Sequence, residues 1–361
     1  MAQRNIVSLN ELQVAELLTK SNPDKKVKVG ISGFGRIGKL VFRIIEEMRH
    51  QKNGKIEVVA INCPSITSEN LKYLIKYDSV HQPSNFDIEI FDQYIIVNKH
   101  TIKLFRERDP SKIKWDEAGV EYVIDSTGAF KTKEKAAKHF TSNNVKKVLI
   151  TAPSTDIPMY VIGVNGTSYD HNEKIVSNSS CTTNCLGPIA KVIDNYVGIE
   201  KGFITTVHAI TSSQNTLDGR ASKNIRIGRS CHNIIPSTTG ATSSLGLILP
   251  SLKNKIQGLS YRVPTNNVSI IDFSFVTKKN TTYKNIINNL TLASNTTLKG
   301  ILRCSNEELV SSDFIHDSHS CIVDIKLGKE IGNNFFKIVA WYDNEWGYSN
   351  RVVDLLKVIA L

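Results

Sequence analysis

Apolar and polar residues alternate where the chain first becomes strongly patterned, at Val27, Val29 and Ile31, and this period of two predicts a β-strand. A glycine-rich turn follows, and apolar residues then recur at helical spacing over residues 40–45. Residues 58–61 form a short apolar run of the kind found in buried strands. Strand, glycine turn, helix and strand, in that order, indicate the first unit of a doubly wound α/β sheet.

The pattern changes along the rest of the chain. Short apolar runs at residues 122–124 and 148–150 predict further strands of the same sheet, whereas residues 268–276 alternate over a longer stretch. Longer alternating strands after residue 180 favour a second, more antiparallel sheet. Residues 349–361 carry apolar side chains at helical spacing and predict a final amphipathic helix. We therefore predict an α/β fold with a Rossmann dinucleotide-binding domain and an α+β catalytic domain whose sheet is mostly antiparallel.

The same change of pattern divides the chain into segments. Residues 1–26 precede the first strand and form an N-terminal extension, in which a capping box at residues 8–11 and the leucines after it predict a short helix. We assign residues 27–180 to the Rossmann dinucleotide-binding domain and residues 181–343 to the catalytic domain.

Composition excludes several classes of protein. The chain has 361 residues, of which 40% are hydrophobic and 22% charged, as in an ordinary globular protein with room for two cores. We expect no membrane span, since no run of 18 apolar residues occurs, and no secretory signal at the N-terminus. Six scattered cysteines are too few for a disulfide framework or a zinc site, so we expect a cytoplasmic protein without a metal. The net charge of +11 attracts anions, but no basic stripe indicates nucleic-acid binding.

The glycine turn contains Gly33, Gly35 and Gly38 between a predicted strand and a predicted helix. The first glycine permits the tight turn, the second lets a pyrophosphate approach the backbone, and the third lets helix and strand pack closely. The end of the second strand carries Cys63 in place of the carboxylate that usually binds the adenosine ribose. No arginine follows to bind a 2′-phosphate, so we predict NAD as the cofactor, with weakened affinity.

A candidate nucleophile, Cys181, lies among small polar residues and is followed by residues 186–190, which predict the start of a helix. A thiol at a helix N-terminus is favoured as a thiolate, and the free N–H groups there can receive an oxyanion. Cys185 is four residues further on and is expected to be buried. A structural role for Cys181 stays open at this point. His208 lies in a β-rich run, where a lone histidine is usually structural, so spacing alone does not select it.

Nine short segments, taken together and in order, resemble the phosphorylating glyceraldehyde-3-phosphate dehydrogenase family. The chain resembles a diverged, eukaryote-like member of this family with an N-terminal extension. The resemblance runs from Lys28 to Leu356. The segments that carry it are residues 33–38, 76–79, 126–128, 151–154, 180–185, 205–208, 233–236, 262–265 and 341–351.

The resemblance implies a reaction. Cys181 would attack the aldehyde of glyceraldehyde 3-phosphate, and His208 would hold the thiolate as an ion pair and act as the base. Hydride would pass to NAD, and inorganic phosphate would release the resulting thioester as 1,3-bisphosphoglycerate. It also implies glycolysis, a homotetramer, and a C-terminal helix, residues 344–361, that rejoins the NAD-binding domain.

Binding residues follow from the same resemblance, position by position. Those implied for the cofactor are Gly33, Gly35, Arg36, Ile37, Gly38, Cys63, Ser126, Thr127 and Asn344. Those implied for the substrate's phosphate are Thr211 and Arg262, and those for the attacking phosphate are Ser180, Thr182, Thr239 and Gly240.

The chain departs from the family pattern at a few positions: Ser32 replaces an asparagine, Cys63 an aspartate and Asn215 a lysine, and residues 226–233 are one residue short. These departures leave two alternatives to the active enzyme. One is a weakly active paralogue that works as a scaffold or RNA-binding protein. The other is a dehydrogenase of a related sugar-phosphate aldehyde, such as erythrose 4-phosphate. The intact Cys181 and His208 favour the active enzyme.

Overall fold

The computed structural model describes residues 26–50, 54–220 and 225–360. The helix expected within the N-terminal extension lies outside these ranges. The helices of the described chain are α2 (Arg36–His50), α3 (Ser68–Lys76), α4 (Lys133–Ala136), α5 (Cys181–Val197), α6 (Ala241–Ile248), α7 (Tyr283–Asn295) and α8 (Trp346–Ile359). None of them has the length and apolar character needed to cross a bilayer.

The first sheet is built by the first half of the described chain. Its strands are β1 (Val27–Ser32), β2 (Ile56–Asn62), β3 (Ile88–Ile90), β4 (Tyr94–Val97), β5 (His100–Phe105), β6 (Tyr122–Asp125), β7 (Lys147–Ile150) and β8 (Ile175–Ser177), in the order β3-β4-β5-β2-β1-β6-β7-β8. Strand β1 pairs in parallel with β2 on one side and β6 on the other. The chain therefore changes direction across β1 and β6, and the carboxyl ends of these strands border the crevice where such sheets bind ligands.

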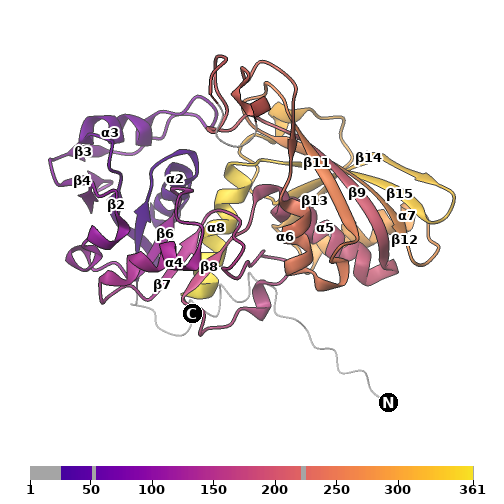
Figure 1. Ribbon diagram of the computed structural model, residues 1–361, viewed down its shortest axis with the longest axis horizontal. Coiled ribbons are helices and arrows are strands. Elements are labelled where there is room, and N and C mark those ends of the chain that lie inside the picture. Colours follow the sequence, from indigo (N-terminus) through magenta and orange to yellow (C-terminus); the bar gives the residue numbers. More distant parts are fainter. Residues whose placement is uncertain (1–25, 51–53, 221–224, 361) are drawn as a thin grey trace.

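The second sheet is mixed, with more antiparallel than parallel pairings among the described strands (Figure 1). Its strands are β9 (Ile199–His208), β10 (Ile235–Thr238), β11 (Ile256–Arg262), β12 (Ser269–Thr277), β13 (Leu302–Ser305), β14 (Cys321–Ile331) and β15 (Phe335–Tyr342), in the order β10-β11-β9-β12-β15-β14-β13. Helix α5 packs on β9, β12, β14 and β15, and α7 packs on β13 and β14. The predicted pairing of a Rossmann sheet with a mostly antiparallel one is confirmed.

Strand β12 shows how burial follows the predicted alternation. Every second residue from Ser269 to Thr277 is buried, including Ile271, Phe273 and Phe275. The strand begins one residue later than the apolar pattern indicated, because Val268 has a φ of 67° and leaves the extended region there.

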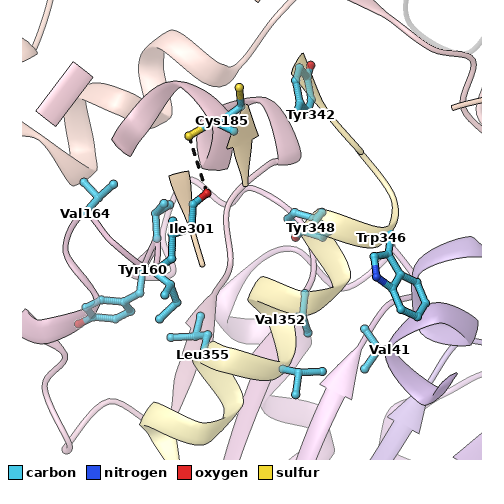
Figure 2. Close-up of a cluster of buried hydrophobic side chains, with 14 of the residues drawn as sticks. Val41, Tyr160, Val164, Cys185, Ile301, Tyr342, Trp346, Tyr348, Val352 and Leu355 are labelled. Carbon is cyan, nitrogen blue, oxygen red and sulfur yellow. Dashed lines mark hydrogen bonds between the residues drawn. The ribbon is translucent and has the colours of Figure 1, made fainter. Parts of the chain in front are cut away.

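Helix α8 packs the last part of the described chain against the first domain. It begins at Trp346, three residues before the predicted start, and packs against α2. Figure 2 shows Tyr348, Val352 and Leu355 of α8 in a cluster of buried apolar side chains that also holds Val41 of α2. The C-terminal helix thus contacts the helix that follows β1, even though the second sheet lies between them in the sequence.

Candidate active site

Cys181 is the first residue of α5, so the helix starts five residues earlier than its apolar pattern predicted. Ser180 is the N-cap, and its Oγ accepts a hydrogen bond from the Thr183 N–H at 3.0 Å. Ser179 turns the chain into the helix with a φ of 59°. The thiol therefore lies in the first turn of a 17-residue helix, where unpaired N–H groups and the helix dipole favour negative charge.

Four residues along the helix, the other cysteine has a different environment. Cys185 is fully buried among apolar side chains, whereas Cys181 is partly exposed. Burial raises the pKa of the Cys185 thiol well above its ordinary value. This confirms the expectation that Cys185 is a buried residue and leaves Cys181 as the accessible thiol of the pair.

His208 ends strand β9 and faces Cys181. Its Nε2 lies 3.5 Å from Cys181 Sγ, and its Nδ1 lies 2.7 Å from the carbonyl oxygen of Ala209. When Nδ1 carries the proton and donates it to this carbonyl, Nε2 is free to accept a proton from sulfur. The geometry therefore pairs an accessible thiol with a base.

Arg262 reaches the same histidine from the neighbouring strand. Strands β9 and β11 are parallel, and their register places Arg262 beside His208. The guanidinium Nη1 lies 2.7 Å from His208 Nδ1 and 3.4 Å from the Ala209 oxygen. A protonated Nδ1 cannot also accept from Arg262, so the two groups compete for the Ala209 oxygen. An anionic ligand that drew the guanidinium away would remove this competition.

The charge states of the pair follow from this environment. Burial raises the pKa of the Cys181 thiol, although the charge of Arg262 opposes the shift. Burial together with Arg262 lowers the pKa of His208 to about 3. Each group titrating alone is therefore neutral at neutral pH. A proton transfer from Sγ to Nε2 instead creates opposite charges 3.5 Å apart, and their attraction offsets part of the cost of charging.

Tyr342, which the motif spacing did not single out, contacts the neighbours of Cys181 and the ring of His208. Its hydroxyl lies 3.0 Å from Thr182 Oγ1 and 2.9 Å from Thr206 Oγ1, and its ring meets the His208 ring edge-on at 6.0 Å. Tyr342 is almost completely buried at the end of β15. The sequence pattern indicates only that such a residue is buried, because these contacts bring together three separate elements.

Asn344 is connected to the same region through Ser269, a residue for which the sequence predicted no role. Ser269 Oγ donates to Asn344 Oδ1 at 2.7 Å and accepts from the Ala209 N–H at 3.1 Å. The oxygen of the Asn344 amide is thus occupied, and its NH₂ group is left to donate to a ligand. Asn344 and His208 are therefore positioned by one chain of hydrogen bonds.

The glycine turn lies at the carboxyl ends of β1 and β6. Gly33 has a φ of 88°, and a Cβ on Gly38 would lie 2.2 Å from the Gly33 carbonyl oxygen. A Cβ on Gly35 would meet nothing within 4 Å among the described residues. Ser126 Oγ donates to the Gly33 oxygen at 2.7 Å and so holds the turn to the loop after β6. The turn therefore fits a dinucleotide, with open space over Gly35 and free N–H groups in the first turn of α2.

Comparison with known proteins identifies the family. Residues 27–133 match the NAD-binding domain of glyceraldehyde 3-phosphate dehydrogenase, and residues 180–344 match its C-terminal domain. The chain belongs to the glyceraldehyde-3-phosphate dehydrogenase family. The resemblance inferred from the motifs is thereby confirmed, and so is NAD as the cofactor of these NAD-dependent oxidoreductases.

Individual relatives are similar over nearly the whole chain. A cytosolic glyceraldehyde-3-phosphate dehydrogenase of Chlamydomonas reinhardtii is 50% identical over 93% of this chain and 97% of its own length. That of Podospora anserina is 47% identical over 92% of this chain and 98% of its own. A chloroplastic enzyme of Arabidopsis thaliana is 46% identical over 97% of this chain and 82% of its own. These relatives come from more than one compartment.

The remaining residues predicted to bind the cofactor follow β2 and β6. Cys63 comes directly after β2, its N–H bonds the Phe105 oxygen at 3.0 Å, and burial raises the pKa of its thiol. It thus offers a neutral thiol where the ribose of NAD is expected. Thr127 Oγ1 donates to Asp125 Oδ1 at 2.6 Å, which fixes the loop beside Gly33.

The other predicted phosphate ligands have local hydrogen bonds. The Thr211 N–H bonds Gln214 Oε1 at 3.0 Å, and Thr239 Oγ1 accepts from the Ala241 N–H at 3.2 Å. Gly240 precedes α6, and a Cβ there would meet nothing within 4 Å among the described residues. These contacts position the backbone, and the phosphate roles of Thr211, Thr239 and Gly240 stay predictions.

Proposed function

We propose that this chain is a phosphorylating glyceraldehyde-3-phosphate dehydrogenase that converts glyceraldehyde 3-phosphate and inorganic phosphate into 1,3-bisphosphoglycerate. The observation that carries the proposal is the 3.5 Å approach of Cys181 Sγ to His208 Nε2 at the N-terminus of α5. The family membership and the dinucleotide-shaped glycine turn support it. The residues around this pair take part in the two chemical steps that follow.

In the first step His208 Nε2 takes the proton of the Cys181 thiol, and sulfur attacks the carbonyl carbon of the aldehyde. The product is a thiohemiacetal, whose oxygen is received by the N–H groups of the first turn of α5. His208 then holds the hydroxyl proton of this intermediate as the carbon is oxidised to a thioester. When bound, NAD supplies the oxidising equivalent by accepting a hydride.

In the second step inorganic phosphate attacks the thioester carbon, the carbon–sulfur bond breaks, and the thiolate of Cys181 leaves and takes back the proton held by His208. We assign the binding of this phosphate to Ser180, Thr182, Thr239 and Gly240. Two of these hydroxyls have fixed positions, since Ser180 caps α5 and Thr182 bonds Tyr342. Fixed donors lower the cost of ordering the attacking anion.

Arg262 is assigned to the phosphate of the substrate, with Thr211. A guanidinium suits a phosphate because it presents parallel N–H donors and a permanent charge. Once engaged with the substrate, Arg262 no longer competes with His208 Nδ1 for the Ala209 oxygen, so substrate binding itself readies the base.

We further propose a homotetramer in the cytoplasm. The face of the second sheet opposite α5 and α7 exposes Phe203, Leu259 and Phe335, which are 70%, 42% and 41% accessible and share one side by register. Exposed apolar side chains gathered on one face are typical of subunit contacts. The cytoplasmic location rests on the cysteines, since all six lie within the described ranges and are free thiols. Light scattering of the wild type and of Phe203→Asp tests the assembly, and an unchanged mass would count against this face.

The activity is tested by following NADH formation with glyceraldehyde 3-phosphate, with and without inorganic phosphate. We expect sustained turnover only when phosphate is present. Erythrose 4-phosphate, assayed in parallel, tests the related-aldehyde alternative, and faster turnover with it would replace the proposed substrate. Absence of turnover with either aldehyde at millimolar NAD would leave the scaffold or RNA-binding alternative.

A further inference from the structure

A group of charged side chains ties the start of α2 to the segment that carries Asn344. Arg36 is the first residue of α2, and its Nε and Nη2 donate to the two carboxylate oxygens of Glu345 at 2.9 and 2.5 Å. The same guanidinium bonds Asp78 Oδ2 at 2.6 Å. A two-pronged bond of this kind fixes both the distance and the orientation of its partners. We call Arg36, Lys39, Asp78, His81 and Glu345 the cofactor clamp.

The charges of the clamp are balanced and largely buried. The side chain of Asp78 is completely buried and that of Glu345 is 11% exposed. Burial alone would raise the pKa of Glu345, but hydrogen bonds from Arg36 and His81 outweigh it and lower that pKa. Asp78 is held ionised in the same way by Lys39, which lies 2.5 Å away, and by Arg36. Both carboxylates therefore stay charged at neutral pH and continue to accept hydrogen bonds from the Arg36 guanidinium.

Two histidines complete the contact from the side of Glu345. His81 Nε2 lies 3.0 Å from Glu345 Oε2, so this nitrogen carries a proton and donates it to the carboxylate. His316 Nδ1 lies 3.4 Å from His81 Nδ1, so the two rings share one hydrogen bond. The His316 ring stacks on Trp346 at 3.6 Å, directly after Glu345 in the chain. The carboxylate is thus held from two directions.

The backbone around Glu345 is equally fixed. Asp343 Oδ1 accepts from the N–H groups of Glu345 and Trp346 at 2.9 and 2.7 Å, which forms the turn that begins α8. Asn344 lies inside this turn, with its amide oxygen bonded to Ser269. Figure 2 shows Trp346 next to α2, where α8 meets that helix. A displacement of Glu345 relative to Arg36 would therefore move Asn344 relative to the glycine turn.

We propose that Glu345 is a positioning residue for the cofactor: by holding Arg36 it fixes the spacing between the pyrophosphate site at the start of α2 and the carboxamide donor of Asn344. This inference rests on the proposed function, because it takes the glycine turn and Asn344 as the two ends of the NAD site. Glu345 contacts neither reacting atom and acts through Arg36 and the turn that holds Asn344.

The test compares the affinities of two ligands for wild type and for Glu345→Gln, a variant that keeps the shape of the side chain and removes its charge. NAD uses both ends of the site, whereas ADP-ribose lacks the nicotinamide and uses only the pyrophosphate end. Calorimetric titration should show NAD binding weakened about tenfold and ADP-ribose binding changed less than about twofold, since one charge-assisted contact corresponds to roughly this factor. In the assay the KM for NAD should rise with little change in kcat at saturating NAD.

Matched variants separate positioning from general destabilisation. Glu121→Gln breaks another carboxylate pair, with Lys146 at 2.6 Å, outside the clamp and should leave both affinities unchanged. Arg36→Gln should weaken NAD to the same extent as Glu345→Gln, and the double variant should be no worse than either single variant. Equal loss of NAD and ADP-ribose, or a lowered melting temperature with unchanged NAD binding, would overturn the proposal. If wild type binds NAD but does not oxidise the aldehyde, the proposed function fails while the clamp stands.

Discussion

The cofactor clamp and the site around Cys181 are both buried and polar, but their charges are arranged differently. In the clamp, Arg36 and Lys39 face Asp78 and Glu345, and the carboxylates stay ionised despite burial. Around Cys181 the guanidinium of Arg262 faces a thiol and an imidazole. Paired charges hold the clamp in one arrangement, whereas the thiol and the imidazole beside Arg262 can exchange a proton. The comparison indicates how one fold holds a cofactor rigidly and keeps its nucleophile reactive.

The largest expected effect comes from removing the reactive sulfur. Cys181→Ser should lower kcat at least about a thousandfold, because a hydroxyl is a far weaker nucleophile at neutral pH. Cys185→Ala is the matched control at the buried thiol four residues away, and it should lose stability but keep kcat within about twofold. Steady-state assays and thermal melts measure both. Retained activity in Cys181→Ser would place the nucleophile elsewhere.

Removing the charge of Arg262 should have the next largest effect. Arg262→Met should raise the KM for glyceraldehyde 3-phosphate about 10- to 100-fold and change that for unphosphorylated glyceraldehyde little, since a charge-assisted contact to phosphate is lost.

The same variant tests the electrostatics of the base. Arg262 helps to lower the pKa of His208 to about 3, so removing its charge raises that pKa. The neutral base is then lost at a higher pH during acidification. With unphosphorylated glyceraldehyde, the acid limb of kcat/KM should shift to higher pH in Arg262→Met. An unshifted limb would show that Arg262 does not act on the base.

A smaller effect is expected at the ribose end of the cofactor site. Cys63→Asp should tighten NAD binding by up to about tenfold, since a carboxylate can accept from the ribose hydroxyls where the thiol is neutral. It should also weaken NADP through charge repulsion. Cys63→Asn, which has the same shape without the charge, is the control. Titration of both cofactors decides the matter, and equal NAD affinity in wild type and Cys63→Asp would contradict this account of the position.

The smallest effect concerns stability beside the clamp. Burial, His81 and Arg43 lower the pKa of His316 to about 4 from its ordinary 6.5. The unfolded chain therefore binds a proton more readily than the folded one, and stability is lost as pH falls from about 6.5 to about 4. His316→Asn tolerates the positive φ of 69° and removes the titrating ring. Its melting temperature should fall about 2 °C less than that of wild type on acidification. His50→Asn, at an exposed imidazole, should behave like wild type.

The two regions also differ in how far the sequence predicted them. The glycine turn could be read directly, because its chemistry lies in the backbone of consecutive residues and Gly33, Gly35 and Gly38 have fixed spacing. The nucleophile was indicated by its polar neighbours and a nearby helix, although that helix begins at Cys181 rather than at residue 186. The proposed base was not indicated by local sequence. His208 could be chosen only through the resemblance to the family, since eight other histidines compete for the role.

Taken by itself, the sequence determined the alternation of strands and helices, the dinucleotide turn and a cysteine among small polar residues beside a helix. All three depend on side chains and backbone groups that are close together in the chain. Tertiary structure alone decided that Arg262 lies beside His208, that Tyr342 supports Thr182, and that Glu345 holds Arg36. The physical reason is that strand register and helix packing bring these groups together from elements far apart in the chain, and local periodicity carries no information about that pairing.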